Sequence, residues 1–195
     1  MGRMIFAFLL RMLPAALAAV PAVAVLRFFG VRRLRQAGLD TTPWHEAGLW
    51  AFLLFLAGLA AITVVPQGWQ WTGLSWDRIN LIPFRVFRES FILRRATGSW
   101  GYFVINVVGN IVMFLPLGFF PCLLWGEWKS GLWRGTGCAL LASLCVELCQ
   151  LPQNRGTDVD DLWLNALGGA LGFGLYWLVS RRWPGVAERF RVKKR

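Results

Sequence analysis

Long apolar runs alternate with short polar or basic stretches along the chain. The apolar runs cover residues 4–26, 49–65, 102–124, 136–151 and 162–179. A helix needs about 20 apolar residues to cross a bilayer, and each run approaches or exceeds that length. Arg11 interrupts the first run, where a cleavable signal peptide is the alternative to a span. The pattern predicts an all-α bundle of five membrane-spanning helices.

The stretch from 67 to 100 has a different pattern. Trp69, Trp71 and Trp76 are typical of an aromatic belt at a membrane interface. Five arginines in the stretch exclude a further span. Its apolar positions recur at helical spacing, which predicts an amphipathic helix lying in the interface or packed across the mouth of the bundle. Those apolar positions are Ile82, Val86, Phe87 and Phe91, and the charges largely elsewhere on the helical wheel are Arg85, Arg88, Glu89 and Arg95.

Composition supports the bilayer as the solvent. Of 195 residues, 56% are hydrophobic and 16% charged, whereas soluble domains are about 45–50% apolar and about 25% charged. We therefore expect residues 1–195 to form a single membrane domain. The net charge of +11 would suggest nucleic-acid binding in a soluble protein. Here the basic residues cluster between apolar runs, where they orient the protein and attract anionic lipids, so no nucleic-acid partner is expected.

The basic clusters also predict an orientation. The loop after the first span, the loop around Lys129 and Arg134, and the tail 181–195 hold thirteen of the 21 basic residues. The positive-inside rule places this side in the cytoplasm. The C-terminus is then a basic cytoplasmic tail and the N-terminus lies outside. The five arginines of the 67–100 stretch fall on the outer side and count against this assignment.

Small residues within the apolar runs predict helix packing rather than chemistry. Gly168 and Gly172 form a GxxxG pattern, which lets a neighbouring backbone approach. We expect them to seat another span of the same chain rather than a second copy. The chain has a single histidine, His45, and no CxxC pair, so we expect no metal site, disulfide or cofactor. The cysteines are Cys122, Cys138, Cys145 and Cys149.

Polar side chains in three of the predicted spans fall at helical spacing. Because successive spans run antiparallel, the start of the third span, the end of the fourth and the start of the fifth share one membrane face. Polar groups are costly within a membrane and often mark a site, so a polar pocket is expected at this face, with Arg155 in the connecting loop. The three sets are Asn106 with Asn110, then Ser143, Glu147 and Gln150, then Asp158, Asp161 and Asn165.

The order of these motifs resembles the VanZ-like family over about residues 49–179. The resemblance implies a multi-pass protein of the bacterial inner membrane that is linked to the cell envelope, in a family whose named member gives resistance to the glycopeptide teicoplanin. The residues that carry the resemblance are Asn80-Leu81-Ile82-Pro83-Phe84, Asn106, Asn110, Phe114-Leu115-Pro116-Leu117-Gly118, Glu147-Leu148-Cys149-Gln150, Arg155, Asp161, Asn165 and Gly168-Gly169.

The mixed charge of the predicted pocket favours a zwitterionic or amide-bearing head group. Arg155 would bind an anionic part, Glu147 and Asp161 a cationic or N–H part, and Arg85 with Arg88 would draw anionic head groups near. The expected partners are membrane lipids, a lipid-linked cell-wall precursor or a glycopeptide antibiotic. Our candidate ligand-binding residues are Asn80, Arg85, Asn106, Asn110, Glu147, Gln150, Arg155, Asp158, Asp161 and Asn165.

Other interpretations remain open at this stage. Glu147 and Asp161 could serve as the acid and base of an enzyme acting on an envelope lipid. Nucleophilic catalysis is disfavoured, because His45 is predicted at the opposite membrane surface. Glu147 could instead form a structural ion pair with Arg155, and Asp158 and Asp160 could be solvated loop charges. The chain could also be a structural partner of another envelope protein.

Overall fold

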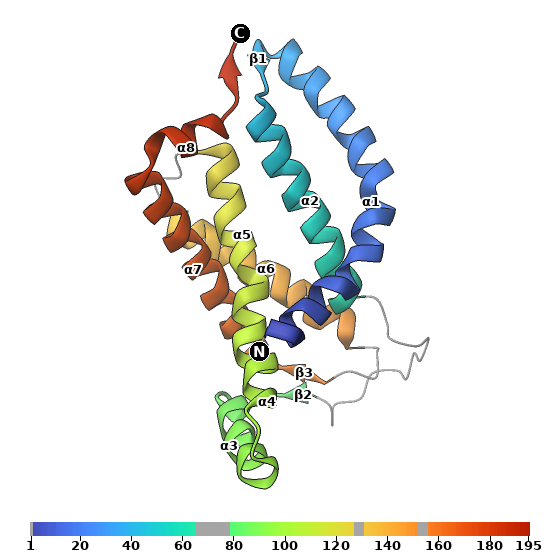
Figure 1. The fold of residues 1–195 in the computed structure, drawn as a ribbon, viewed down its shortest axis with the longest axis vertical. Helices are drawn as coiled ribbons and strands as arrows, with labels where there is room; N and C mark the ends of the chain where they lie inside the picture. The colour runs from blue at the N-terminus through green and yellow to red at the C-terminus, as the bar shows by residue number, and fades with distance from the viewer. Residues whose placement is uncertain (1, 65–78, 127–130, 152–155) are drawn as a thin grey trace.

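The computed structural model describes residues 2–64, 79–126, 131–151 and 156–195. Five helices in these ranges are long and apolar enough to cross a membrane (Figure 1). The chain is therefore an all-α, multi-pass membrane protein, as the hydropathy pattern predicts. The spans are α1 (Gly2–Gln36), α2 (Pro43–Thr63), the continuous run Gly101–Trp125, α6 (Gly131–Gln150) and α7 (Val159–Arg182).

The first two spans form a hairpin that is longer than predicted. We expected α1 to end near residue 26 and α2 to begin near 49, with a basic loop between them. Instead α1 continues to Gln36, since Arg27 is neutralised across the hairpin by the carboxylate of Glu46 at 2.6 Å. The turn is made at Gly38, whose φ of +71° suits glycine. Thr42 then caps α2, its hydroxyl accepting the His45 N–H at 3.0 Å.

The basic tail is folded onto this hairpin rather than free. After α7 the chain forms α8 (Pro184–Arg189) and β4 (Lys193–Lys194), which pairs antiparallel with β1 (Leu39–Asp40). His45 Nδ1 lies 2.7 Å from the Phe190 carbonyl, and the Thr42 hydroxyl donates to the Arg189 carbonyl at 2.6 Å. These contacts join the C-terminus to the α1–α2 turn, at the upper end of Figure 1.

The third span changes helix type near its start. It consists of α4 (Gly101–Phe103), the π-helical segment η2 (Val104–Val108) and α5 (Gly109–Trp125). Such π segments widen the helix by one residue and often occur at functional sites. In Figure 1, α6 crosses obliquely behind α5, while α7 runs beside it. Within this segment Val107 is buried, and it packs against Val86 and Leu164.

Close packing of α5 against α7 depends on glycine. A β-carbon built on Gly172 would meet the Leu115 carbonyl group, and one built on Gly168 would meet that of Ile111. Gly118 on α5 likewise faces the backbone of Gly169. The GxxxG of α7 thus seats α5 of the same chain, as the sequence predicts. This packing holds the polar ends of α5, α6 and α7 in register.

The surface helix α3 (Arg85–Thr97) lies outside the five spans, at the lower end of Figure 1. It begins after Phe84, a non-glycine residue at φ 64°, and ends at Gly98. β2 (Ile79–Asn80) precedes it and pairs in parallel with β3 (Thr157–Asp158). Val86 is buried and Phe91 is exposed, whereas Ile82, which we expected on the same helix, precedes it and is exposed. The predicted tryptophan belt lies outside the described residues.

Candidate functional site

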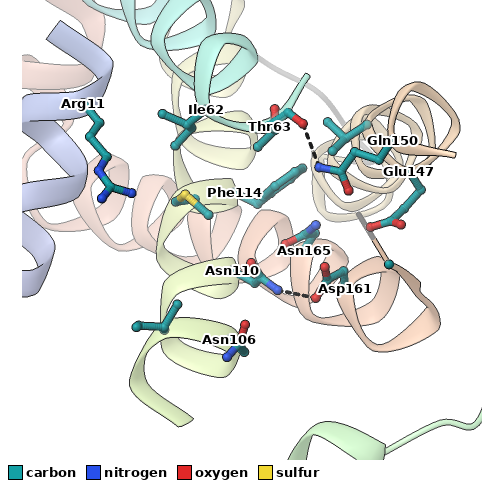
Figure 2. Close-up of a pocket in the computed structure, with 14 residues that line it drawn as sticks. Arg11, Ile62, Thr63, Asn106, Asn110, Phe114, Glu147, Gln150, Asp161 and Asn165 are labelled. Carbon is teal, nitrogen blue, oxygen red and sulfur yellow. Dashed lines mark hydrogen bonds between the residues drawn. The ribbon is translucent and has the colours of Figure 1, made fainter. Parts of the chain in front are cut away.

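A pocket of about 410 Å³ lies where the polar ends of the spans meet. Figure 2 shows its side chains converging from α1, α2, the third span, α6 and α7. This volume falls within the range of about 300–1,000 Å³ that is usual for ligand sites. Six of the ten candidate residues line the pocket, namely Asn106, Asn110, Glu147, Gln150, Asp161 and Asn165. The structure therefore brings together six residues that helical spacing places on one membrane face.

Two carboxylates share the pocket. Glu147 is only 3% exposed, and its Oε2 accepts the backbone N–H of Asp158 at 3.2 Å. Asp161 Oδ1 accepts a hydrogen bond from Asn110 Nδ2. Neither carboxylate forms an ion pair with any residue that the structure describes. The predicted partner of Glu147, Arg155, lies outside those residues.

The amide side chains of the pocket are held by the protein through their nitrogen atoms. Asn106, within η2, donates to the Tyr102 carbonyl at 2.9 Å. Gln150 donates to the Thr63 carbonyl at 2.7 Å, which joins α6 to α2. Asn165 donates to the Ser143 hydroxyl at 2.8 Å, which joins α7 to α6. Each amide is fixed in orientation by its own bond.

Arg11 is a pocket residue that the sequence reasoning missed. It lies on α1 and lines the side of the pocket that faces away from α6 and α7. We interpreted it only as an interruption of the first apolar run. The available signal was a single guanidinium in an otherwise apolar span, since ionisable residues at membrane depth usually face a cavity or a partner. Its position gives the pocket a cation opposite the two carboxylates.

Three candidate residues lie outside the pocket. Asn80 Nδ2 donates to Asp158 Oδ1 at 2.8 Å, beside the β2–β3 pairing. The same oxygen of Asp158 accepts the N–H of Asp160 at 2.9 Å and so caps α7. Arg85 is exposed and forms an ion pair with Glu89 at 2.6 Å. The contacts of Asn80 and Asp158 brace the segments around the pocket, and that of Arg85 lies within α3.

Asp160 is the second residue that the sequence reasoning missed, because we considered it a loop charge. It is fully buried and its carboxylate accepts three N–H groups. The donors are Phe84 N at 2.6 Å, Val86 N at 2.8 Å and Trp163 Nε1 at 2.8 Å. The carboxylate thereby satisfies backbone N–H groups at the start of α3 that have no partner within the helix. Asp160 therefore joins the surface helix α3 to the start of α7 by hydrogen bonds.

Glu89 makes a second attachment between α3 and the bundle, and this one depends on pH. Its carboxylate accepts hydrogen bonds from the Tyr102 hydroxyl at 2.5 Å and from Arg85 at 2.6 Å. The bond from Tyr102 is the main reason that the pKa of Glu89 lies below its ordinary value of 4.5, and Arg85 adds to it. A lowered pKa stabilises the folded form above the ordinary value, and this contribution is lost as pH falls through the lowered one.

We therefore expect hydrogen-exchange protection in α3 to decrease as pH falls below 4.5, after correction for intrinsic exchange rates. The control is Glu89→Gln, which cannot ionise and should lack this step while leaving protection in α7 unchanged. An identical acid-induced step in the Glu89→Gln protein would show that another group holds α3.

The chemistry available to the pocket is restricted. Ser143 and His45 lie on different parts of the bundle, since His45 is at the far end of α2 against Phe190. Across the described ranges, no three His, Cys, Asp or Glu residues gather closely enough to hold a metal ion. The described residues that line the pocket offer two carboxylates, four amides and one guanidinium. Those groups suit the binding of a polar, charged head group or carboxylate acid–base chemistry.

Comparison with known proteins shows the family of the chain. A family model described as VanZ/LLP1 matches residues 52–180. The matched range begins within α2 and ends within α7, so it includes every pocket residue except Arg11. Searches of curated proteins and of solved structures gave no match. The chain belongs to the VanZ/LLP1 family.

Proposed function

We propose that this protein binds the polar head of an amphiphilic cell-envelope molecule in the pocket between α1, α2 and the third, fourth and fifth spans. The ligand classes are a membrane lipid, a lipid-linked cell-wall precursor or a glycopeptide antibiotic such as teicoplanin. The observation that supports the proposal is a cavity of about 410 Å³ with two carboxylates and four amides inside a bundle of apolar helices. Polar groups within membrane-spanning helices are costly unless they meet a partner, a ligand or water.

The geometry suits an amphiphile because the head and tails have separate environments. The pocket lies near the ends of the spans, where lipid head groups are found, whereas neighbouring helix surfaces are apolar and exposed. Leu148 on α6 and Leu13 on α1 are 56% and 49% exposed, as lipid-facing residues are. Acyl chains can therefore remain in the bilayer while the head group enters the pocket.

We also propose that the protein lies in the bacterial inner membrane with the pocket toward the outside. The folded tail and the α1–α2 turn bring basic residues together at the opposite end of the bundle, on the side assigned to the cytoplasm. With five spans, the N-terminus is then outside and the C-terminus cytoplasmic. An outward pocket is accessible to envelope precursors and to antibiotics.

The test is retention of lipid by the purified protein. We expect native mass spectrometry in a mild detergent to show envelope lipid bound to the wild-type protein, and we expect Glu147→Ala to lose about tenfold or more in occupancy, because it removes a buried charged partner. Glu188→Ala, an exposed change on α8, is the control and should retain lipid. Equal retention by Glu147→Ala and wild type would contradict the proposed function.

A second candidate function is catalysis on the bound envelope lipid. It is favoured by the presence of Glu147 and Asp161 in one pocket, where one carboxyl group can donate a proton and the other accept one. Turnover of a labelled envelope lipid by purified protein, abolished in Glu147→Gln, would favour the enzyme. Tight lipid binding without turnover would favour the binding protein. The scaffold interpretation has less support, because α5 already occupies the glycine face of α7.

A further inference from the structure

Apart from Arg11, the polar side chains of the described residues that line the pocket leave mainly hydrogen-bond acceptors free for a ligand. The partners of the amides establish which end of each amide is used. Tyr102 and Thr63 present backbone carbonyl groups, which only accept, so Asn106 and Gln150 must direct their NH₂ groups to them. Their carbonyl oxygens then have no donor among the residues that the structure describes.

The same holds for the two asparagines nearer Asp161. Asn110 directs its NH₂ group to the carboxylate of Asp161, which only accepts when ionised. Asn165 directs its NH₂ group to the Ser143 hydroxyl, whose own proton is directed to the Asp161 backbone carbonyl at 3.5 Å. Asn110 and Asn165 are therefore also left with a carbonyl oxygen.

Asn165 Oδ1 is the most informative of these atoms. The residue is 4% exposed and lines the pocket, yet its oxygen has no hydrogen-bond partner within the described part of the chain. Buried polar atoms are almost always paired. A buried acceptor without a donor points to a missing ligand that carries one. Together with the two carboxylates, it makes one wall of the pocket rich in acceptors and negative charge.

The opposite wall carries Arg11, the only cation among the described residues that line the pocket. Arg11 projects from α1 toward the cavity, while Glu147, Asp161 and Asn165 lie across it (Figure 2). A guanidinium with no ion pair in the described structure suits a phosphate group. The pocket therefore combines a subsite for N–H donors with a subsite for an anion.

We infer that the pocket selects phospholipids with a primary ammonium head group, with the ammonium at the acceptor wall and the phosphodiester facing Arg11. This inference rests on the proposed function and names its ligand class. An ammonium supplies three N–H donors to the carboxylates and amide oxygens. A trimethylammonium head group has the same charge but no N–H, so it leaves those acceptors unpaired. A phosphoglycerol head group lacks the positive charge that the two carboxylates require.

The test compares three phospholipids with identical acyl chains and the phosphoethanolamine, phosphocholine or phosphoglycerol head group. Each is added to delipidated, purified protein in detergent, and occupancy is measured by native mass spectrometry. We expect the phosphoethanolamine lipid to be preferred over the phosphocholine lipid by about tenfold or more, because a site built for hydrogen bonds discriminates against a ligand that lacks the donors.

Two variants separate the two subsites. Glu147→Gln should bring the ratio of phosphoethanolamine to phosphocholine binding close to one, whereas Arg11→Gln should weaken both lipids to a similar extent, since both carry the phosphodiester. Arg11 is exposed, so its variant is expected to fold even if Glu147→Gln does not. Glu188→Gln, far from the pocket on α8, is the control and should retain the wild-type ratio.

The outcomes distinguish this inference from the function on which it rests. Equal binding of the phosphoethanolamine and phosphocholine lipids, lost in Glu147→Ala, would overturn the ammonium selectivity and leave the lipid-binding function standing. Binding that is the same in wild type, Glu147→Ala and Arg11→Gln would overturn both. An effect of Arg11→Gln on the head-group ratio but not on overall affinity would also overturn the assignment of the phosphate to Arg11.

Discussion

Replacement of Gly172 by alanine is expected to separate α5 from α7 and to unfold the bundle at a lower temperature. The added β-carbon would lie 2.9 Å from the Leu115 carbonyl carbon and 3.0 Å from Phe119 N, and it would overlap the Leu115 carbonyl oxygen. Alanine favours a helix over glycine by about 1 kcal/mol, but overpacking against backbone costs about 1–3 kcal/mol or more. Since backbone cannot rotate out of the way, we expect the clash to dominate.

The measurement is thermal unfolding in detergent. A net loss of about 2 kcal/mol corresponds to a decrease of about 4–8 °C in the midpoint for a chain of this size. Gly174→Ala is the matched control on the same helix, because a β-carbon there meets nothing within 4 Å. It should leave the midpoint unchanged or raise it. Equal midpoints for the Gly172→Ala protein and the wild type would contradict the close packing of α5 and α7.

Removal of the carboxylate of Asp160 is expected to release α3 from the bundle. Asp160→Ala leaves three N–H donors without their acceptor, on Phe84, Val86 and Trp163, and the Val86 bond is fully buried. An unsatisfied buried donor costs about 1–3 kcal/mol, and the loss of the other two hydrogen bonds adds to this cost. We expect the amides of α3 to exchange with solvent at least about tenfold faster, with a smaller effect on α5 and α6.

The control for this change is Asp40→Ala. Asp40 is also an aspartate with two basic neighbours, Arg35 at 3.9 Å and Arg195 at 3.6 Å, but all three side chains are exposed. Exposed ion pairs contribute about 0–1 kcal/mol, so little change is expected. Hydrogen exchange followed by mass spectrometry resolves α3 from the spans. Unchanged protection of α3 in Asp160→Ala would show that other contacts hold it.

The number of membrane-spanning helices was predictable, because the bilayer determines how long and how apolar each helix must be. Apolar length alone defines five crossings, and charge density alone excludes a crossing in the stretch that contains α3. The ends of α1 and α2 were not predictable, because the charge of Arg27 is balanced by Glu46, which lies 19 residues away in sequence. The docking of the tail was also missed, since its partners His45 and Thr42 lie about 145 residues earlier.

The pocket was predictable to the extent that helical spacing and antiparallel order fix it. Asn110 reaches Asp161 because α5 and α7 run side by side with their polar ends together. Arg11 was missed because periodicity within α1 does not say which helix α1 packs against. Asp160 was missed because it lies off the stripe of pocket residues on α7, and its main partners are backbone N–H groups, which any sequence supplies.

Because β4 pairs with β1, the position of the C-terminus shows on which side of the membrane the α1–α2 turn lies. The backbone N–H of Arg195 donates to the Gly38 carbonyl at 2.9 Å, so the last residue and the α1–α2 turn must face the same compartment. A tag that extends from Arg195 therefore emerges beside that turn, whichever way the protein is inserted. Protease digestion of such a tag in intact and in opened cells would reveal, in one experiment, which compartment each end of all five crossings faces.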